Sequence, residues 1–198
     1  MEQIRSFIAI ELPGEIKAAL TRFQLRLKSG EHSYVKWVDP DTIHLTLKFL
    51  GNIQADKTDE IAAAIAAGSR GIPPFRLELA QPGAFPNLNR VQVIWVGIEG
   101  DLASLQHLQQ SIESALKPLG FPGESRPFRA HLTLARLRDQ ATPQQRQDLG
   151  RNIAGADLKT TDGFTVDAVS LMRSQLTQQG AVHNRLNTVR LTPGKRQS

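Results

Sequence analysis

The sequence predicts an α+β fold with largely antiparallel sheets. Its predicted elements run strand, helix, strand, helix and two strands, and then helix, strand, short helix and two strands. Few of the strands are separated by the helical crossovers that a parallel sheet needs. The tetrapeptide His-Leu-Thr-Leu occurs at 44–47 and again at 131–134, in roughly corresponding halves, which indicates an internal repeat. No linker separates the halves, so we expect one domain over residues 1–198.

The first half begins with a strand at Ile4–Leu12, which is rich in β-forming residues and is stopped by Pro13 and Gly14. An amphipathic helix follows at Glu15–Gly30, because its apolar residues recur at helical spacing and a glycine stands at its end. The remaining elements of this half are a short extended segment at 34–38, a strand at 42–51 and an Ala-rich helix at Ala55–Arg70.

The second half begins with two neighbouring strands, because Phe75–Ala80 alternates apolar and polar residues and Val91–Gly100 is β-rich after a turn. A long helix at Asp101–Gly120 has Asp101 as its N-cap and Gly120 beyond its end. The remaining elements are a strand at 126–137, a helix that starts at Thr142-Pro143, strands at Phe164–Leu176 and His183–Thr192 with a turn at 178–180 between them, and a frayed tail.

Composition excludes several kinds of chemistry. The chain has no cysteine, which removes disulfides, thiol catalysis and cysteine-based zinc sites. A net charge of +5 suits a phosphate-rich partner but is also common in ordinary soluble proteins. No apolar run is long enough to span a bilayer and the N-terminus lacks a signal-peptide core, so we expect a cytoplasmic protein, a monomer, with no membrane partner.

The repeated tetrapeptide places an imidazole beside a hydroxyl. Side chains at i and i+2 share one face of a strand, so His44 faces the same way as Thr46, and His131 the same way as Thr133. Two imidazoles can act as general base and general acid near neutral pH, while two hydroxyls donate to phosphate oxygens. If the two strands lie side by side, this set suits the cleavage of a phosphodiester without a metal.

Other interpretations of these histidines are possible. A single His-x-Thr is more often a feature of a half-polar strand than a site, but two framed copies favour a site. Zinc bound by both histidines with His107 or His183 is disfavoured, because each motif supplies one ligand and contains no carboxylate. We therefore expect no metal and no other cofactor.

Residues around the two motifs are candidates for substrate contact. Arg126 and Arg129 precede the second motif closely. Alternation places Lys48 on the face of His44 and Thr46, where it could contact phosphate. Phe49 either stacks on an RNA base or, by the same alternation, belongs to the core with the leucines of the first motif.

The paired motifs resemble those of the 2H phosphoesterase superfamily. The segments RSFIAIELP, VKWVDPDTIHLTLKFLG and RPFRAHLTLAR resemble its LigT/ThpR branch, the RNA 2',3'-cyclic phosphodiesterases also known as the 2'-5' RNA ligase family, and the similarity runs from Arg5 to about Leu191. This resemblance implies a bilobal fold with pseudo-twofold symmetry, in which antiparallel sheets line a central cleft and helices lie outside. It also implies metal-independent opening of a 2',3'-cyclic phosphate at an RNA 3' end to a 2'-phosphate.

The resemblance also implies roles for individual residues. His44 would protonate the leaving 3'-oxygen, His131 would activate water, and Thr46 and Thr133 would hold the phosphate, although the residues alone do not distinguish the two imidazoles. Arg136 corresponds to a position next to the substrate, but strict alternation puts it on the face opposite His131 unless a bulge redirects it. Phe7 corresponds to a first-strand aromatic, in the core or in the cleft wall.

One position departs from the family pattern, because His183 stands where a tyrosine is usual. It either alters the pH dependence or is a simple exchange of surface rings. Alternative functions are an ATP-independent 2'-5' RNA ligase, a phosphodiesterase for small cyclic nucleotides and a non-catalytic module that binds RNA ends. The chain has no Gly-rich nucleotide loop of the G-x-x-x-x-G-K-[ST] type, which disfavours an ATP-driven ligase.

Overall fold

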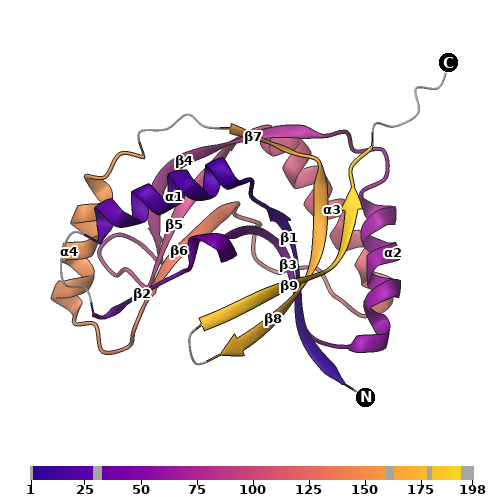
Figure 1. Cartoon of the computed structure of the whole chain (residues 1–198), viewed down its shortest axis with the longest axis horizontal. Coiled ribbons are helices and arrows are strands. Elements are labelled where there is room, and N and C mark those ends of the chain that lie inside the picture. The colour runs from indigo at the N-terminus through magenta and orange to yellow at the C-terminus, as the bar shows by residue number, and fades with distance from the viewer. Residues whose placement is uncertain (1, 29–32, 159–162, 178–179, 193–198) are drawn as a thin grey trace.

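Two antiparallel sheets form the framework of the protein. The computed structural model describes residues 2–28, 33–158, 163–177 and 180–192. One sheet has the strand order β3-β1-β8-β9 and the other the order β2-β6-β5-β4-β7 (Figure 1). The strands are β1 (Gln3–Glu11), β2 (Val35–Trp37), β3 (His44–Gln54), β4 (Phe75–Phe85), β5 (Val93–Gly100), β6 (His131–Leu137), β7 (Gly163–Val166), β8 (Ala168–Thr177) and β9 (Gly180–Arg190).

Four helices accompany the sheets within the described ranges: α1 (Gly14–Leu27), α2 (Thr58–Gly68), α3 (Leu102–Leu116) and α4 (Pro143–Ala154). The predicted N-termini of α3 and α4 are confirmed. The Asp101 side chain accepts a hydrogen bond from the Ser104 amide, and Thr142 forms a capping box with Gln145. The predicted antiparallel α+β class is confirmed as well. None of the helices in the described ranges is long and apolar enough to cross a membrane.

Some element boundaries differ from the sequence predictions. The predicted helix at 55–70 begins as a 3₁₀ turn, η2 (Ala55–Lys57), and α3 gives way to another, η3 (Lys117–Leu119), before Gly120 takes a left-handed backbone with φ of 86°. Strand β4 continues five residues past Ala80, through an irregularity between Leu79 and Pro82. Part of the predicted turn at 178–180 lies outside the described residues.

Each of the two helices that follow a central strand packs on the other sheet. Helix α1 follows β1, but Gln24 of α1 donates hydrogen bonds to the backbone oxygens of Val38 (2.9 Å) and Leu134 (3.1 Å), beside β6. Helix α3 follows β5, but its Glu113 pairs with Lys48 of β3 at 3.0 Å. In Figure 1, α1 and α4 lie on one side of the molecule and α2 and α3 on the other. The two halves are therefore interleaved.

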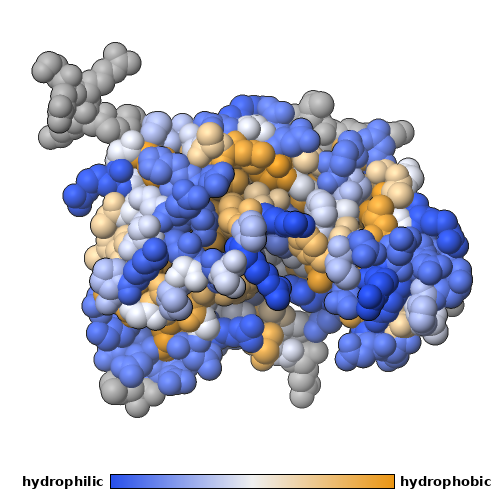
Figure 2. Space-filling model, turned by 180° about the vertical axis from the view of Figure 1, so that it is seen from behind, coloured by the Kyte–Doolittle hydropathy of each residue, from blue (hydrophilic) through white to orange (hydrophobic). Residues whose placement is uncertain are grey.

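The hydrophobic core is continuous between the sheets. Fully buried residues of both halves, among them Ile10, Leu45, Ile94 and Leu132, belong to a single cluster. Seen from behind in Figure 2, hydrophobic residues gather near the middle of the surface and hydrophilic residues lie on both sides of them. Burial of the leucine side of each motif strand fixes which way the histidine side points.

The pairing of β1 with β3 repeats in the pairing of β5 with β6. In the first pair the partners are Glu11 with His44, Ala9 with Thr46 and Phe7 with Phe49. In the second pair they are Gly97 with His131, Trp95 with Thr133 and Val93 with Arg136. Each motif strand carries one extra residue after its threonine, Leu47 or Leu134, which is a β-bulge in the same place. The expected internal symmetry thus extends to single residues.

Candidate active site

The two motif histidines are held by equivalent hydrogen bonds. Nδ1 of His44 lies 2.8 Å from the Thr42 carbonyl oxygen, and Nδ1 of His131 lies 2.7 Å from the Arg129 carbonyl oxygen. A carbonyl oxygen only accepts, so Nδ1 carries the hydrogen in both rings and Nε2 is left for chemistry. The carbonyl of Thr42 is presented by a 3₁₀ turn, η1 (Pro40–Thr42), capped by the side chain of Asp39.

Aromatic rings fix the orientation of each imidazole. Phe7 stacks on His44 with ring centroids 4.5 Å apart, and His183 meets His44 edge-on at 5.1 Å. On the other side of the site, Phe85 meets His131 edge-on at 5.0 Å. Rings packed in this way cannot turn freely, so both Nε2 atoms have defined directions.

Burial changes the protonation of His44. The pKa of His44 is lowered to about 4, chiefly by desolvation; the hydrogen bond to Thr42 opposes this change, and the charge of His183 adds a smaller lowering effect. Burial also lowers the pKa of His183. In the free protein at neutral pH, His44 is therefore a neutral ring with an unprotonated Nε2.

Both threonines of the motifs are available to a ligand. Thr46 and Thr133 are half-buried, and within the described residues neither hydroxyl takes part in a hydrogen bond. Strands β3 and β6 contact one another, and on each strand the core lies on the leucine side. The four polar side chains of the motifs therefore lie on the open side of this junction, as a phosphate site with two imidazoles and two hydroxyls requires.

The bulges decide the orientation of three neighbouring residues: they correct the prediction for Lys48 and settle the alternatives left open for Phe49 and Arg136. Lys48 does not share the face of His44: it is 4% exposed and its Nζ donates to Glu113 (3.0 Å) and to the Pro122 oxygen (2.8 Å). Phe49 is not a core residue, because the same bulge leaves it 62% exposed. Arg136 is exposed on the face of His131, since Leu134 is the extra residue there.

The other candidates are placed as follows. Phe7 is only 2% exposed beneath His44, so it supports that ring and is not itself a substrate contact. The side chains of Arg126 and Arg129 are exposed before β6, and His107 is exposed on α3. Among the described residues there is no group of three or more His, Cys, Asp or Glu side chains that could hold a metal ion.

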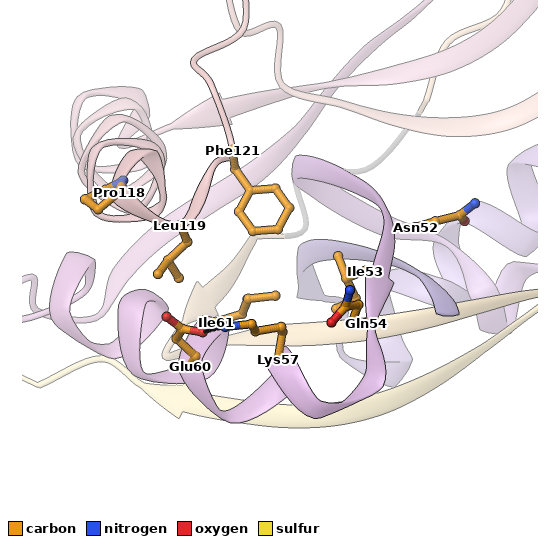
Figure 3. A pocket seen from close by; sticks show the side chains of 9 residues that line it. All are labelled: Asn52, Ile53, Gln54, Lys57, Glu60, Ile61, Pro118, Leu119 and Phe121. Carbon is orange, nitrogen blue, oxygen red and sulfur yellow. Dashed lines mark hydrogen bonds and ion pairs between the residues drawn. The ribbon is translucent and has the colours of Figure 1, made fainter. Parts of the chain in front are cut away.

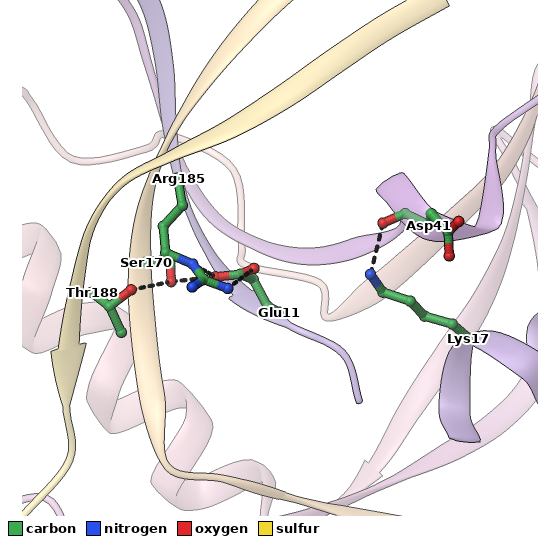
Figure 4. A network of polar contacts seen from close by, with 6 residues as sticks. All are labelled: Glu11, Lys17, Asp41, Ser170, Arg185 and Thr188. Atoms are coloured by element: carbon green, nitrogen blue, oxygen red, sulfur yellow. Dashed lines mark hydrogen bonds and ion pairs between the residues drawn. The ribbon is translucent and has the colours of Figure 1, made fainter. Parts of the chain in front are cut away.

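A carboxylate next to His44 was missed by the sequence analysis. Glu11 lies opposite His44 and accepts two hydrogen bonds from Arg185 (2.7 and 2.8 Å) and one from Ser170 (2.6 Å), which also contacts Thr188 (Figure 4). The bond from Arg185 lowers the pKa of Glu11. This network ties β9 to β1 and so holds His183, two residues from Arg185, against His44. Its members lie on three different strands. The sequence therefore does not show that they meet, because this depends on the register in which the strands pair.

A separate hollow of about 270 Å³ lies near the other end of β3. Phe121 points into it, and Lys57 and Glu60 at its edge form an ion pair at 2.7 Å (Figure 3). Ile53, which lines it, pairs with Ile4, seven residues along β1 from the partner of His44, Glu11, so the two positions are about 24 Å apart along the strand. It does not belong to the histidine site.

Two antiparallel sheets that meet at a pair of His-x-Thr strands define a two-histidine phosphoesterase fold. Residues 12–178 match the family model of the 2'-5' RNA ligase superfamily, and the chain belongs to this family. It is 31% identical to the RNA 2',3'-cyclic phosphodiesterase of Methanothermobacter thermautotrophicus over 189 residues. This matched region covers 96% of this chain and 100% of that protein.

Solved structures agree with this placement. A crystal structure of a protein from Thermus thermophilus matches with a TM-score of 0.76 at 27% identity, over 97% of this chain and all of that one. The crystal structure of Escherichia coli LigT complexed with 3'-AMP matches with a TM-score of 0.73 at 27% identity, over 96% of this chain and 99% of that one.

Proposed function

We propose that the protein is an RNA 2',3'-cyclic phosphodiesterase that hydrolyses a terminal 2',3'-cyclic phosphate to a 2'-phosphomonoester by metal-independent acid–base catalysis. The observation that carries this proposal is the matched pair of imidazoles, each with Nδ1–H bound to a carbonyl and Nε2 directed away from it. The activity named for the relative from Methanothermobacter and the nucleotide bound to LigT support the same substrate class.

The chemistry is an in-line displacement at phosphorus. One imidazole takes a proton from water, the water oxygen bonds to phosphorus, and the bond from phosphorus to the 3'-oxygen breaks as the other imidazole protonates that oxygen. The hydroxyls of Thr46 and Thr133 donate to the non-bridging oxygens. Following the family resemblance, we assign the proton donor to His44 and the base to His131.

This assignment sets a condition on His44. The free protein holds its pKa at about 4, so His44 has to gain a proton before it can act as an acid. A bound phosphate carries a negative charge beside the ring in a poorly solvated site, and this charge favours the imidazolium. The same burial that keeps His44 neutral in the free protein thereby couples its protonation to the arrival of substrate.

The test uses a short RNA with a terminal 2',3'-cyclic phosphate, incubated with the protein in EDTA. We expect a 2'-phosphate product, and His44→Gln and His131→Gln should each slow the reaction at least about 100-fold, because each removes one proton-transfer group. His107→Gln is the matched control, since His107 is exposed on α3 away from the motifs. Circular dichroism verifies that every variant is folded.

Each other outcome points to a different function. An unchanged RNA end with folded protein contradicts the proposal, and cleavage of small cyclic nucleotides alone would indicate a nucleotide phosphodiesterase. Binding without cleavage would indicate a module for RNA ends. A joined product with a 5'-hydroxyl RNA would show the reverse reaction, the ATP-independent ligase after which the family is named. Activity that EDTA abolishes would contradict the metal-independent mechanism.

A further inference from the structure

We propose that Lys36, Arg136 and Arg138 form a track for the RNA backbone on the 5' side of the terminal nucleotide, so that the protein prefers an RNA end to a free nucleoside 2',3'-cyclic phosphate. This inference rests on the proposed function and adds a length requirement to it. We name these three residues the basic track.

The first observation is a pair of like charges placed opposite each other. Lys36 of β2 and Arg136 of β6 are direct partners in the antiparallel ladder, and both are exposed. Like charges directly opposite in a sheet are destabilising. Within the described residues neither forms an ion pair with a carboxylate, unlike Arg185, so an external anion is the natural counter-charge.

The second observation is a hollow that these side chains line. It has a volume of about 410 Å³ and is lined by Lys36, Arg136, Leu137, Arg138, Asp139 and Gln140. The Arg138 amide donates to the Tyr34 oxygen at 2.8 Å, which extends the β2–β6 ladder and fixes the floor. Three cations face a single carboxylate, that of Asp139, so the hollow favours anions.

The third observation is continuity with the catalytic residues. The bulge at Leu134 turns Arg136 onto the face of His131 and Thr133. Because Leu134 is the extra residue, the partners of Thr133 and Arg136 on β5, Trp95 and Val93, are only two residues or about 7 Å apart along the strand. A chain whose terminal phosphate is held by Thr133 can therefore continue over Arg136 into the hollow.

The chemistry of the lining identifies the ligand as backbone phosphate. The hollow offers three cations, one carboxylate, an amide and a leucine, and its lining has no aromatic ring on which a base could stack. Phosphate contacts of this kind give affinity without sequence preference and depend strongly on salt. A nucleoside 2',3'-cyclic phosphate has no second phosphate to place on Lys36 and Arg138, whereas an RNA end has one.

The experiment compares two substrates, a five-nucleotide RNA with a 2',3'-cyclic phosphate and adenosine 2',3'-cyclic phosphate. We expect the wild type to prefer the RNA in kcat/KM, and Lys36→Gln/Arg138→Gln to lower the ratio of the two values about tenfold. The logarithmic salt dependence of RNA binding should become shallower by about 1.4, since each lost phosphate contact removes about 0.7 for single strands. Arg70→Gln, which removes an exposed charge after α2, is the control.

The possible results separate the basic track from the proposed function. If the double variant keeps the ratio and the salt dependence of the wild type, the track is wrong while the phosphodiesterase stands. If the wild type cleaves neither substrate, the proposed function fails. In that case fluorescence anisotropy with a labelled RNA that ends in a 2'-phosphate still decides whether the double variant binds RNA more weakly. Equal weakening by Arg70→Gln would indicate general charge attraction and overturn the track.

Discussion

At the scale of single residues, the two histidines differ although their hydrogen bonds match. Phe7 stacks on the face of His44, His183 meets His44 edge-on, and Glu11 is its partner on the neighbouring strand. His131 has Gly97 at the equivalent position. The sequence repeat predicted two equivalent imidazoles, but it could not show this difference, because it arises from side chains on neighbouring strands.

The buried state of His44 makes stability depend on pH. Its pKa is about 4 in the folded protein and about 6.5 in the unfolded chain, so the unfolded chain binds more protons between these values. The free energy of unfolding therefore falls as the pH falls from about 6.5 to about 4. We expect His44 to account for about 2 kcal/mol of the loss between pH 7 and pH 4.5.

Urea unfolding of the wild type and of His44→Gln at both pH values measures this contribution. The variant should lose about 2 kcal/mol less on acidification, because glutamine does not titrate. His183, whose lowered pKa acts in the same direction, is present in both proteins and contributes to both. Equal losses in the two proteins would show that His44 is not held neutral by burial.

At the scale of elements, the two bulges decide which residues surround the site. Alternation correctly places His44 with Thr46 and His131 with Thr133, and it fails only beyond the extra residue. A bulge is a property of a strand and its partner together, so one strand's sequence does not reveal it. Helix starts such as Asp101 were predicted because a cap depends on residues within one turn.

A buried ion pair between Lys48 and Glu113 lies directly after the first bulge, and this predicts the effect of changing Lys48. Lys48→Met leaves Glu113 without its cation, and we expect a loss of about 3 kcal/mol in the free energy of unfolding. The double variant Lys48→Met/Glu113→Leu should lose less, because no charge is left unpaired. Denaturant unfolding of both variants gives the comparison.

The control for this prediction is an exposed ion pair. Lys57→Met breaks the contact with Glu60, and both of those side chains are about half exposed, so the loss should stay below about 1 kcal/mol. If Lys48→Met weakened RNA binding at unchanged stability, Lys48 would contact the substrate, as simple alternation indicates, and the inward orientation would be wrong.

At the scale of the whole molecule, the exchange of helices between the sheets joins the two halves. The sequence repeat and the strand order indicated two corresponding halves, but an amphipathic helix shows only that one face is buried and not which sheet buries it. The contacts of Gln24 and Glu113 supply that information. The repeat therefore produces one interleaved core instead of two that could fold separately.

An interleaved core predicts one cooperative unfolding transition. Leu45 belongs to the first sheet and Leu132 to the second, and both are fully buried, so each change to alanine should lower the free energy of unfolding by about 3 kcal/mol. Trp37 and Trp95 both lie in the second sheet and report on it by fluorescence, while far-ultraviolet circular dichroism reports on all the helices and strands. In Leu45→Ala the two signals should move together to the same lower urea midpoint, although the substitution lies in the sheet without tryptophan. Separate midpoints in this variant, with the fluorescence transition left at its wild-type position, would instead mean that the halves unfold independently.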